Sequence, residues 1–122
     1  MNKATALLAL GRGKSLVAEL PSTEGRRSWL GMYPLNTEWQ TTKDFLKARG
    51  QPFPLRQTSA YRIRLFEVDK ELIEIDIDLS ESDLRRKSDI FAFGEYGLEE
   101  KTKGAGIDFS GLNYPFKTDY PI

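Results

Sequence analysis

The chain of 122 residues contains neither cysteine nor histidine. Without cysteine it can form no disulfide and offers no thiolate nucleophile, which fits a reducing compartment. Without histidine it lacks the commonest general base and the commonest metal ligand in proteins. The two absences together remove the usual means of nucleophilic and acid–base catalysis.

The chain also has no long hydrophobic run. The apolar stretch at residues 4–10 ends after seven residues, because Arg12, Gly13 and Lys14 follow it. A membrane span needs about 20 apolar residues, and a signal peptide needs a longer apolar region with a small-residue cleavage site. At 39% apolar, the chain can bury one modest core. We therefore predict a cytoplasmic protein of one domain, residues 1–122, that does not contact a membrane.

Motifs for cofactors and covalent catalysis are also missing. The sequence Gly13-Lys14-Ser15 resembles the end of a phosphate-binding loop, but that loop needs a glycine five positions before Gly13, where Leu8 stands. No Gly-x-Ser-x-Gly sequence marks a nucleophilic serine. We predict that the protein is not an enzyme and needs no cofactor.

Charge is present in balance but unevenly distributed. Residues 1–64 hold eleven basic and four acidic side chains, a net of +7, whereas residues 65–122 hold seven basic and fourteen acidic ones, a net of −7. Such asymmetry can mark an acidic or nucleic-acid partner. Alternatively, the two halves pair in space and neutralise each other, because sheets place oppositely charged strands side by side.

The clearest helix is predicted near residues 37–49. Asn36 or Thr37 can cap it, and Gln40 stands at the capping-box spacing from Thr37. Apolar and small side chains recur at steps of three and four, and Gly50 is placed to end the helix in the left-handed conformation. The residues expected on its buried face are Trp39, Thr42, Phe45 and Leu46.

A hairpin is predicted at the centre of the chain. In the first strand, residues 61–68, apolar side chains alternate with basic ones as far as Leu65, and the apolar phase changes at Leu65-Phe66, which indicates a bulge. Residues 72–79 alternate again, which predicts a strand with the isoleucines 73, 75 and 77 on its buried face and acids on its solvent face. With a turn at Asp69-Lys70, the predicted cross-strand ion pairs are Arg62 with Asp76 and Arg64 with Glu74.

The remaining apolar segments complete the predicted fold. Residues 4–10 and 15–20 are predicted as strands, residues 28–34 as a short strand or a packed apolar loop, and residues 89–94 as a central strand covered on both faces. Residues 94–108 are rich in glycine and charge and are predicted to form a mobile connection, after which an aromatic tail packs across the body. The predicted fold class is α+β, an antiparallel sheet of about five strands with one main helix packed on one face.

The acidic run at residues 67–83 holds eight acids and one base. Glu74, Asp76 and Asp78 project from one side of the predicted strand and could hold Mg²⁺ as in a metal-dependent nuclease, although no lysine follows at short spacing. A second alternative is nucleic-acid binding by the basic half, which the sequence pI of about 6.3 disfavours. The cations concerned are Arg12, Lys14, Arg26, Arg27, Lys43 and Lys47.

By elimination, the sequence favours a protein that acts by binding another protein. An acidic segment held on a hairpin can present carboxylates to a basic partner, which gives fast and specific association. Immunity proteins that neutralise bacterial toxins, such as toxin nucleases, belong to this general class, and the comparison is one of class only. The predicted contact residues are Asp76, Asp78, Glu81 and Asp83. No metal site is predicted, and the sequence leaves the oligomeric state open.

Overall fold

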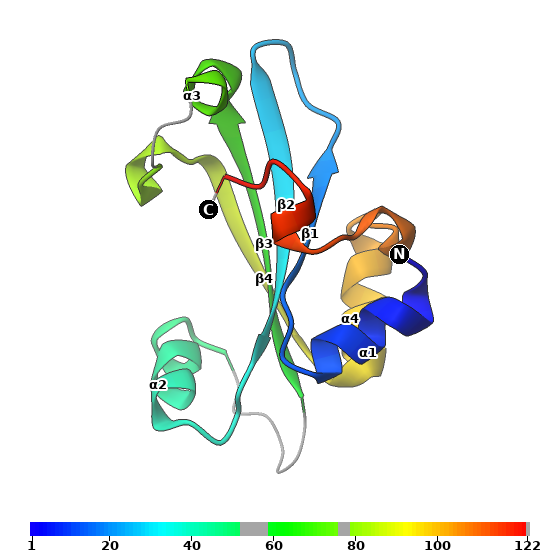
Figure 1. Ribbon diagram of the computed structural model, residues 1–122. Coiled ribbons are helices and arrows are strands. Elements are labelled where there is room, and N and C mark those ends of the chain that lie inside the picture. The colour runs from blue at the N-terminus through cyan, green and yellow to red at the C-terminus, as the bar shows by residue number, and fades with distance from the viewer. Residues whose placement is uncertain (52–58, 76–78, 122) are drawn as a thin grey trace.

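The computed structural model describes residues 1–51, 59–75 and 79–121. Within them the chain forms one antiparallel sheet of four strands in the order β1-β2-β3-β4, together with four α-helices (Figure 1). The α+β class is therefore confirmed, but five strands and a single main helix are not. The elements are α1 (Lys3–Gly11), β1 (Leu16–Leu20), β2 (Arg26–Leu35), α2 (Gln40–Ala48), β3 (Ala60–Asp69), α3 (Lys70–Glu74), the short 3₁₀ helix η1 (Glu81–Asp83), β4 (Arg85–Phe93), α4 (Gly94–Gly104), and the 3₁₀ helices η2 (Phe109–Gly111) and η3 (Pro115–Lys117).

The first predicted strand, residues 4–10, is instead the helix α1. The side chain of Asn2 accepts a hydrogen bond from the backbone N–H of Thr5 at 2.8 Å and caps the helix. Ala6, Ala9 and Leu10 are its buried residues, at helical rather than alternating spacing. The segment is composed largely of alanine and leucine, which are the strongest helix formers, so its uniform apolarity was misread as a buried strand.

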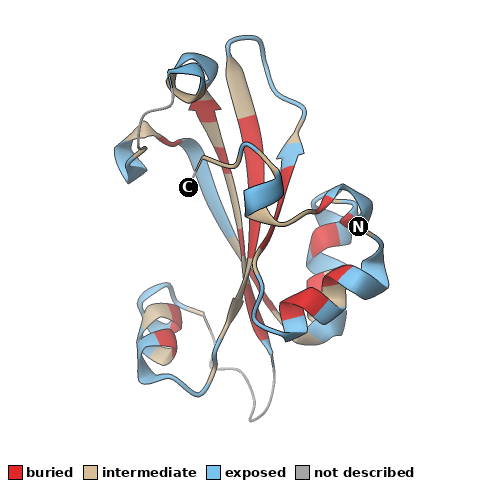
Figure 2. Ribbon diagram, in the orientation of Figure 1, coloured by how far each residue is buried: buried red, intermediate tan, exposed pale blue. Residues whose placement is uncertain are grey.

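One face of the sheet packs against α1 and α4, which lie together beside it in Figure 1. Figure 2 shows the buried residues concentrated along the strands and on parts of these two helices, with exposed residues on other parts of both. Helix α4 occupies the segment predicted to be a mobile connection, and its Leu98 is fully buried. The core on this face consists of Ala6, Ala9, Leu10, Leu16, Ala18, Leu30, Met32, Tyr61, Ile63, Ala92, Leu98, Phe109 and Leu112.

The opposite face has a second, smaller core built around Trp29, which is 1% exposed. Phe66, Val68 and Leu84 pack with Trp29, and Tyr120 from the tail meets the indole edge-on at 5.6 Å between ring centroids. The tail also pairs with β1, because Val17 and Asn113 exchange two backbone hydrogen bonds of 2.8 Å. The predicted packing of the aromatic tail across the body is thus observed.

Strand β3 itself contains no bulge, and the change in apolar phase has another cause. Its pairing with β2 is continuous, whereas its pairing with β4 shifts between Leu65 and Glu67. Ser88 and Arg85 are the partners of these two residues, so the extra residue belongs to β4, where Arg86 has a φ of 52°. Leu65 packs against the first core and Phe66 against the second, so the apolar phase follows the covering layers rather than a slip of the strand.

The predicted second strand of the hairpin, residues 72–79, is wrong where the structure describes it. The chain turns into helix α3 directly after β3, and β4 takes the place beside β3. Ile75, predicted to be buried, is 57% exposed, and Ile77 lies outside the described residues. The segment after Asp69 contains Lys70 and Glu74 at the i,i+4 spacing of a helical ion pair, a signal that the isoleucine alternation obscured.

Strand β4, predicted at residues 89–94 as a central strand, is longer and lies at an edge of the sheet. Its first five residues are exposed and mostly charged, which protects an edge against pairing with other chains. Phe91 and Ala92 near its end are buried, on opposite faces of the sheet. The apolar run therefore reflects burial of the last residues of the strand and not a central position.

Helix α2 confirms the predicted helix in part. It begins at Gln40 rather than near Thr37, and Gly50 follows it with the expected positive φ of 67°. Leu46 and Thr42 are buried as expected, but Trp39 precedes the helix and is 63% exposed. The helix approaches the second face of the sheet through Phe45, which meets Phe91 at 5.9 Å between ring centroids.

Candidate binding surfaces at the two ends of the sheet

The two ends of the sheet differ in the charges they carry. The end of the sheet at which β3 leads into α3 and β4 begins is called the acidic end. The opposite end, where α1 leads into β1 and β2 leads into α2, is called the basic end. Figure 1 shows α3 and η1 near one end of the sheet and α2 near the other. Each end holds residues that the sequence singled out.

Near the acidic end, three of the six described carboxylates of the acidic run pair with basic strand residues. Arg26 on β2 contacts Glu67 at 3.3 Å and Asp69 at 3.4 Å. Arg85 contacts Asp69 at 3.2 Å, and Arg86 lies 3.6 Å from Glu67. The charge asymmetry between the two halves of the sequence is therefore partly neutralised in space, as one of the two alternatives predicted.

The arginines of β3 find partners other than the predicted ones. Arg62 forms a two-fold hydrogen bond with Asp89, at 2.9 and 3.1 Å, whereas its predicted partner Asp76 lies outside the described residues. Arg64 pairs with Glu81 instead of Glu74. Asp89 lies on β4, directly beside β3, so the edge strand supplies the charge that the prediction assigned to residues 72–79.

Glu81, one of the predicted contact residues, is held on the protein surface by two cations. Arg64 donates a hydrogen bond to it, and Lys87 approaches it at 3.7 Å. The hydrogen bond from Arg64 lowers the pKa of Glu81 below the usual carboxyl value. The Glu81 side chain nevertheless remains 64% exposed, and one of its oxygens can still meet a partner.

Asp83, a second predicted contact residue, has a local structural role. Its carboxylate accepts hydrogen bonds from the backbone N–H and the hydroxyl of Ser80, at 2.8 and 3.1 Å, in a capping box that fixes η1. Asp76 and Asp78, the other two predicted contacts, lie outside the described residues.

The described residues between β3 and β4, numbers 70–75 and 79–84, are called the acidic cap. Its apolar side chains are anchored, because Leu72, Ile73 and Leu79 pack against the Trp29 core and Leu84 belongs to it. Its exposed side chains include the carboxylates of Glu71, Glu74 and Glu81, and Ile75 is exposed as well. Sequence reasoning missed Ile75 as a surface residue because it assigned the segment to a strand.

No described part of the chain gathers three potential metal-ligating residues. Glu74 of the proposed acidic triad lies in α3 and is 3.9 Å from Lys70, while the other two members are not described. No helix within the described ranges is long and apolar enough to span a bilayer.

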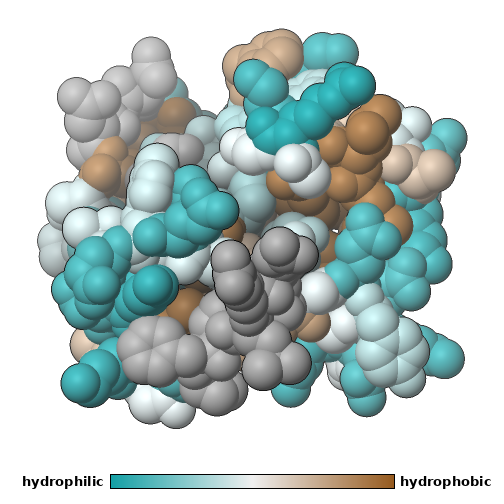
Figure 3. Space-filling view, turned by 90° about the horizontal axis from the view of Figure 1, so that it is seen from below, coloured by the Kyte–Doolittle hydropathy of each residue, from teal (hydrophilic) through white to brown (hydrophobic). Residues whose placement is uncertain are grey.

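At the basic end, four of the six cations considered for nucleic-acid binding come from two segments. Arg12 and Lys14 lie in the exposed turn between α1 and β1, and Lys43 and Lys47 lie on α2. None of these four forms an ion pair with another described residue, as judged by all pairs within 4.0 Å. Figure 3 looks onto this end of the molecule, whose surface is mostly hydrophilic with hydrophobic atoms visible in its hollows.

The other two cations of that set serve the fold. Arg26 belongs to the acidic-end network described above. Arg27 donates two hydrogen bonds of 2.6 Å to Glu19 on the neighbouring strand and contacts Asp119 in the tail at 3.3 Å. Because Arg26 and Arg27 are already paired with carboxylates of the protein, they are not suited to bind the phosphates of a nucleic acid.

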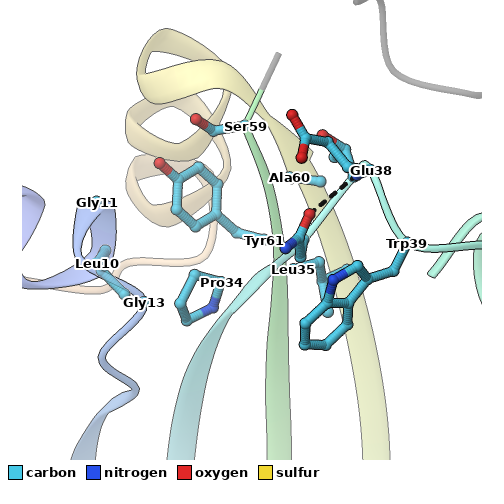
Figure 4. A pocket seen from close by; sticks show the side chains of 12 residues that line it. Leu10, Gly11, Gly13, Pro34, Leu35, Glu38, Trp39, Ser59, Ala60 and Tyr61 are labelled. Atoms are coloured by element: carbon cyan, nitrogen blue, oxygen red, sulfur yellow. Dashed lines mark hydrogen bonds between the residues drawn. The ribbon is translucent and has the colours of Figure 1, made fainter. Parts of the chain in front are cut away.

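A cleft of about 540 Å³ lies at the basic end, next to the turn that carries Arg12 and Lys14. Its walls come from the end of α1, the connection from β2 to α2, and the start of β3. Tyr61, Pro34 and the exposed Trp39 contribute aromatic and apolar surface, and Glu38 and Ser59 contribute polar groups (Figure 4). Sequence reasoning missed the cleft, because its walls meet only after the strands have paired.

Comparison with known proteins gives no relatives: no family model, no curated protein and no solved structure matches this chain.

Proposed function

We propose that the protein is a non-enzymatic binding module whose acidic cap contacts a partner protein with a basic surface. The observation that carries this proposal is Ile75, an aliphatic side chain 57% exposed in a segment otherwise rich in carboxylates. Protein interfaces commonly join an apolar centre to a polar rim, and an exposed Ile at such a centre gains free energy when a partner covers it. Glu71 and Glu74, on the helix α3 that Ile75 directly follows, supply the rim.

The anchoring of the acidic cap supports the same proposal. Leu72 and Ile73 pack against the Trp29 core and so hold α3 in place, and the Ser80–Asp83 capping box fixes η1. Surface groups held in place before binding lose little conformational entropy when a partner arrives. Carboxylates so placed raise the association rate with a positively charged surface.

The partner class that fits best is a basic toxin, such as a nuclease, whose active surface normally meets phosphates. The protein would then act in the cytoplasm as a dedicated inhibitor or immunity protein, a comparison of class rather than of family. Asp76, Asp78, Glu81 and Asp83 remain the proposed contact residues, and the structure suggests adding Glu71, Glu74 and Ile75. Because Glu81 and Asp83 already have partners inside the protein, we expect them to contribute less than Glu71.

The test begins with the product of the neighbouring gene as candidate partner, captured with the whole chain. Kinetic measurements then compare Glu71→Lys with Glu100→Lys, a matched reversal at an exposed position of α4. We expect Glu71→Lys to slow association several-fold at low salt and Glu100→Lys to have a smaller effect. Ile75→Asp should mainly accelerate dissociation.

Two results would contradict the proposal. One is a partner that binds Ile75→Asp and Glu71→Lys as tightly as the unchanged protein. The other is a saturable rise in Tm with Mg²⁺ or Mn²⁺ that Asp76→Ala abolishes, which would favour a metal-dependent enzyme.

A further inference from the structure

The basic-end cleft has the size of a small-ligand site. Its volume of about 540 Å³ falls within the range of pockets that hold cofactors and similar molecules. Leu10 and Pro34 form apolar wall, and the ring of Tyr61 lies between them and the polar groups of Ser59 and Glu38 in Figure 4. Such a mixture of apolar wall and a few polar groups suits an organic ligand rather than a bare ion.

An exposed indole stands at the edge of this cleft. Trp39 is 63% exposed, whereas the only other tryptophan, Trp29, is 1% exposed. Trp39 lines the cleft beside Leu35, at the point where the chain enters α2 (Figure 4). A large aromatic face left open to solvent beside a cleft is a platform on which a planar ring can stack.

A second aromatic ring forms part of the cleft wall. Tyr61 is 3% exposed, belongs to the first core and lines the cleft (Figure 4). A wall of this kind can pack against an apolar or planar part of a ligand. Glu38 adds a carboxylate, which can accept hydrogen bonds from amino groups on base edges. The backbone N–H of Glu38 donates a hydrogen bond of 3.0 Å to the side-chain oxygen of Asn36.

The charges around the cleft favour an anionic group on the ligand. Gly11 and Gly13 line the wall, and Arg12 and Lys14 alternate with them in the same exposed turn. Lys43 follows Trp39 by one helical turn, and its backbone N–H donates to the Trp39 carbonyl at 3.2 Å. Because Glu38 would repel a phosphate, the phosphate side of the ligand belongs beside the Arg12–Lys14 turn.

We propose that the basic-end cleft binds a nucleobase together with its attached phosphate, with the base stacked on Trp39 and the phosphate near Arg12 and Lys14. This chemistry occurs both in single-stranded nucleic acid and in a free nucleotide. The cleft and the acidic cap consist of different residues. An experiment that rules out nucleotide binding by the cleft would therefore leave the protein-binding proposal untouched, and the reverse also holds.

The two tryptophans make the test direct. A single-stranded oligonucleotide of about ten nucleotides is titrated into the whole protein at about 50 mM salt, and tryptophan emission is followed. We expect saturable quenching, because Trp39 is exposed and stacking brings a base onto its ring. Binding is then measured independently by the anisotropy of a labelled oligonucleotide, so that variants lacking Trp39 can be compared.

Three variants test the assignment. Trp39→Ala should weaken binding about 10-fold through lost stacking, and the double change Arg12→Ala with Lys14→Ala should weaken it and flatten its salt dependence. The matched control removes Lys101 and Lys103, two exposed cations of α4. An equal loss in this control, or no loss in Trp39→Ala, would overturn the proposal, as would no saturable binding at all. Circular dichroism confirms that each variant is folded.

A nucleoside 5′-monophosphate distinguishes the two sources of the ligand. Affinity within about threefold of the oligonucleotide, with the same dependence on Trp39, would assign the cleft to a free nucleotide. Much weaker binding would assign it to a strand, because a strand adds phosphates and further bases to the contact.

Discussion

The acidic and basic ends of the sheet carry similar types of residue in different surroundings. At the acidic end, charged residues of β2, β3 and β4 lie beside one another, so that Arg26 and Arg64 meet carboxylates from distant parts of the chain. At the basic end, Arg12 lies on a turn and Lys43 on a helix, and neither forms an ion pair with another described residue. The comparison shows that adjacency across strands, more than charge content, decides which charges are left for a ligand.

The two tryptophans give the largest test of this comparison. Trp29→Ala should lower the free energy of unfolding by about 3–5 kcal/mol, because it empties the core that anchors the acidic cap. Trp39→Ala should lower it by less than about 0.5 kcal/mol, since that side chain is exposed. Urea unfolding measures both.

Trp29→Phe is a useful intermediate. The Trp29 Nε1 is buried and has no hydrogen-bond partner in the described part of the protein, so the change loses packing but no hydrogen bond. Equal costs for Trp29→Ala and Trp39→Ala would contradict the description of the two ends as anchored and open.

The second test concerns the centre of the sheet, between the two ends. A Cβ on Gly31 would lie 2.7 Å from Cε2 of Tyr33 and against the hydroxyls of Tyr33 and Tyr120, which hydrogen-bond to each other. Gly31→Ala should therefore cost about 1–3 kcal/mol of stability through overpacking. Gly97→Ala, in α4 with nothing near its added methyl group, should be neutral or stabilising by about 0.5–1 kcal/mol.

Thermal unfolding separates these outcomes. If Gly31→Ala were as harmless as Gly97→Ala, the tail would not lie against β2 through Tyr120. Burial of Tyr120 and its hydrogen bond with Tyr33 raise its pKa, so the tail should stay docked when pH is raised moderately.

The third test compares one cation from each end. Arg64→Met should cost about 0.5–1.5 kcal/mol, because the arginine is mostly buried and loses its pair with Glu81. Lys47→Met should change stability by less than about 0.5 kcal/mol, since Lys47 is exposed and has no ion-pair partner among the described residues. Urea unfolding at neutral pH measures both, and similar costs would show that the acidic-end pairs contribute nothing measurable.

The sequence predicted the parts of the fold that local patterns specify. The alternation of β3, the end of α2 at Gly50 and the packing of the tail were predicted because period, glycine chemistry and aromatic content act over a few residues. The bulge opposite Leu65 was located correctly, but it lies in β4 rather than β3. That distinction depends on which layers cover the sheet, and no single segment contains this information.

The errors arose where two local signals competed or where distant segments meet. Residues 4–10 and 72–74 are apolar enough for either helix or strand, and both are helical in the structure. For residues 4–10, the high helix propensity of alanine and leucine accounts for the outcome. The partners of Arg62 and Arg64 depend on β4 lying beside β3, which the sequence did not predict. The cleft beside Trp39 likewise needs three segments to converge, so its residues carried no shared signal.

The smallest expected effect is a dependence of the free energy of unfolding on pH that comes from the ion pairs of Arg27 and Arg64. Hydrogen bonds from Arg27 and Arg64 lower the pKa values of Glu19 and Glu81 from the usual 4.5. A carboxyl group with a lowered folded-state pKa stabilises the protein above its unfolded pKa, and this contribution is lost as pH falls toward the lowered value. Since both carboxylates are substantially exposed, each contribution should amount to only a few tenths of a kcal/mol. Urea midpoints measured from about pH 6 to about pH 3 should fall less steeply for Arg64→Met than for the unchanged protein, while Lys47→Met keeps the original slope. An Arg64→Met variant with an unchanged slope would show that Glu81 titrates in the folded protein as it does in the unfolded chain.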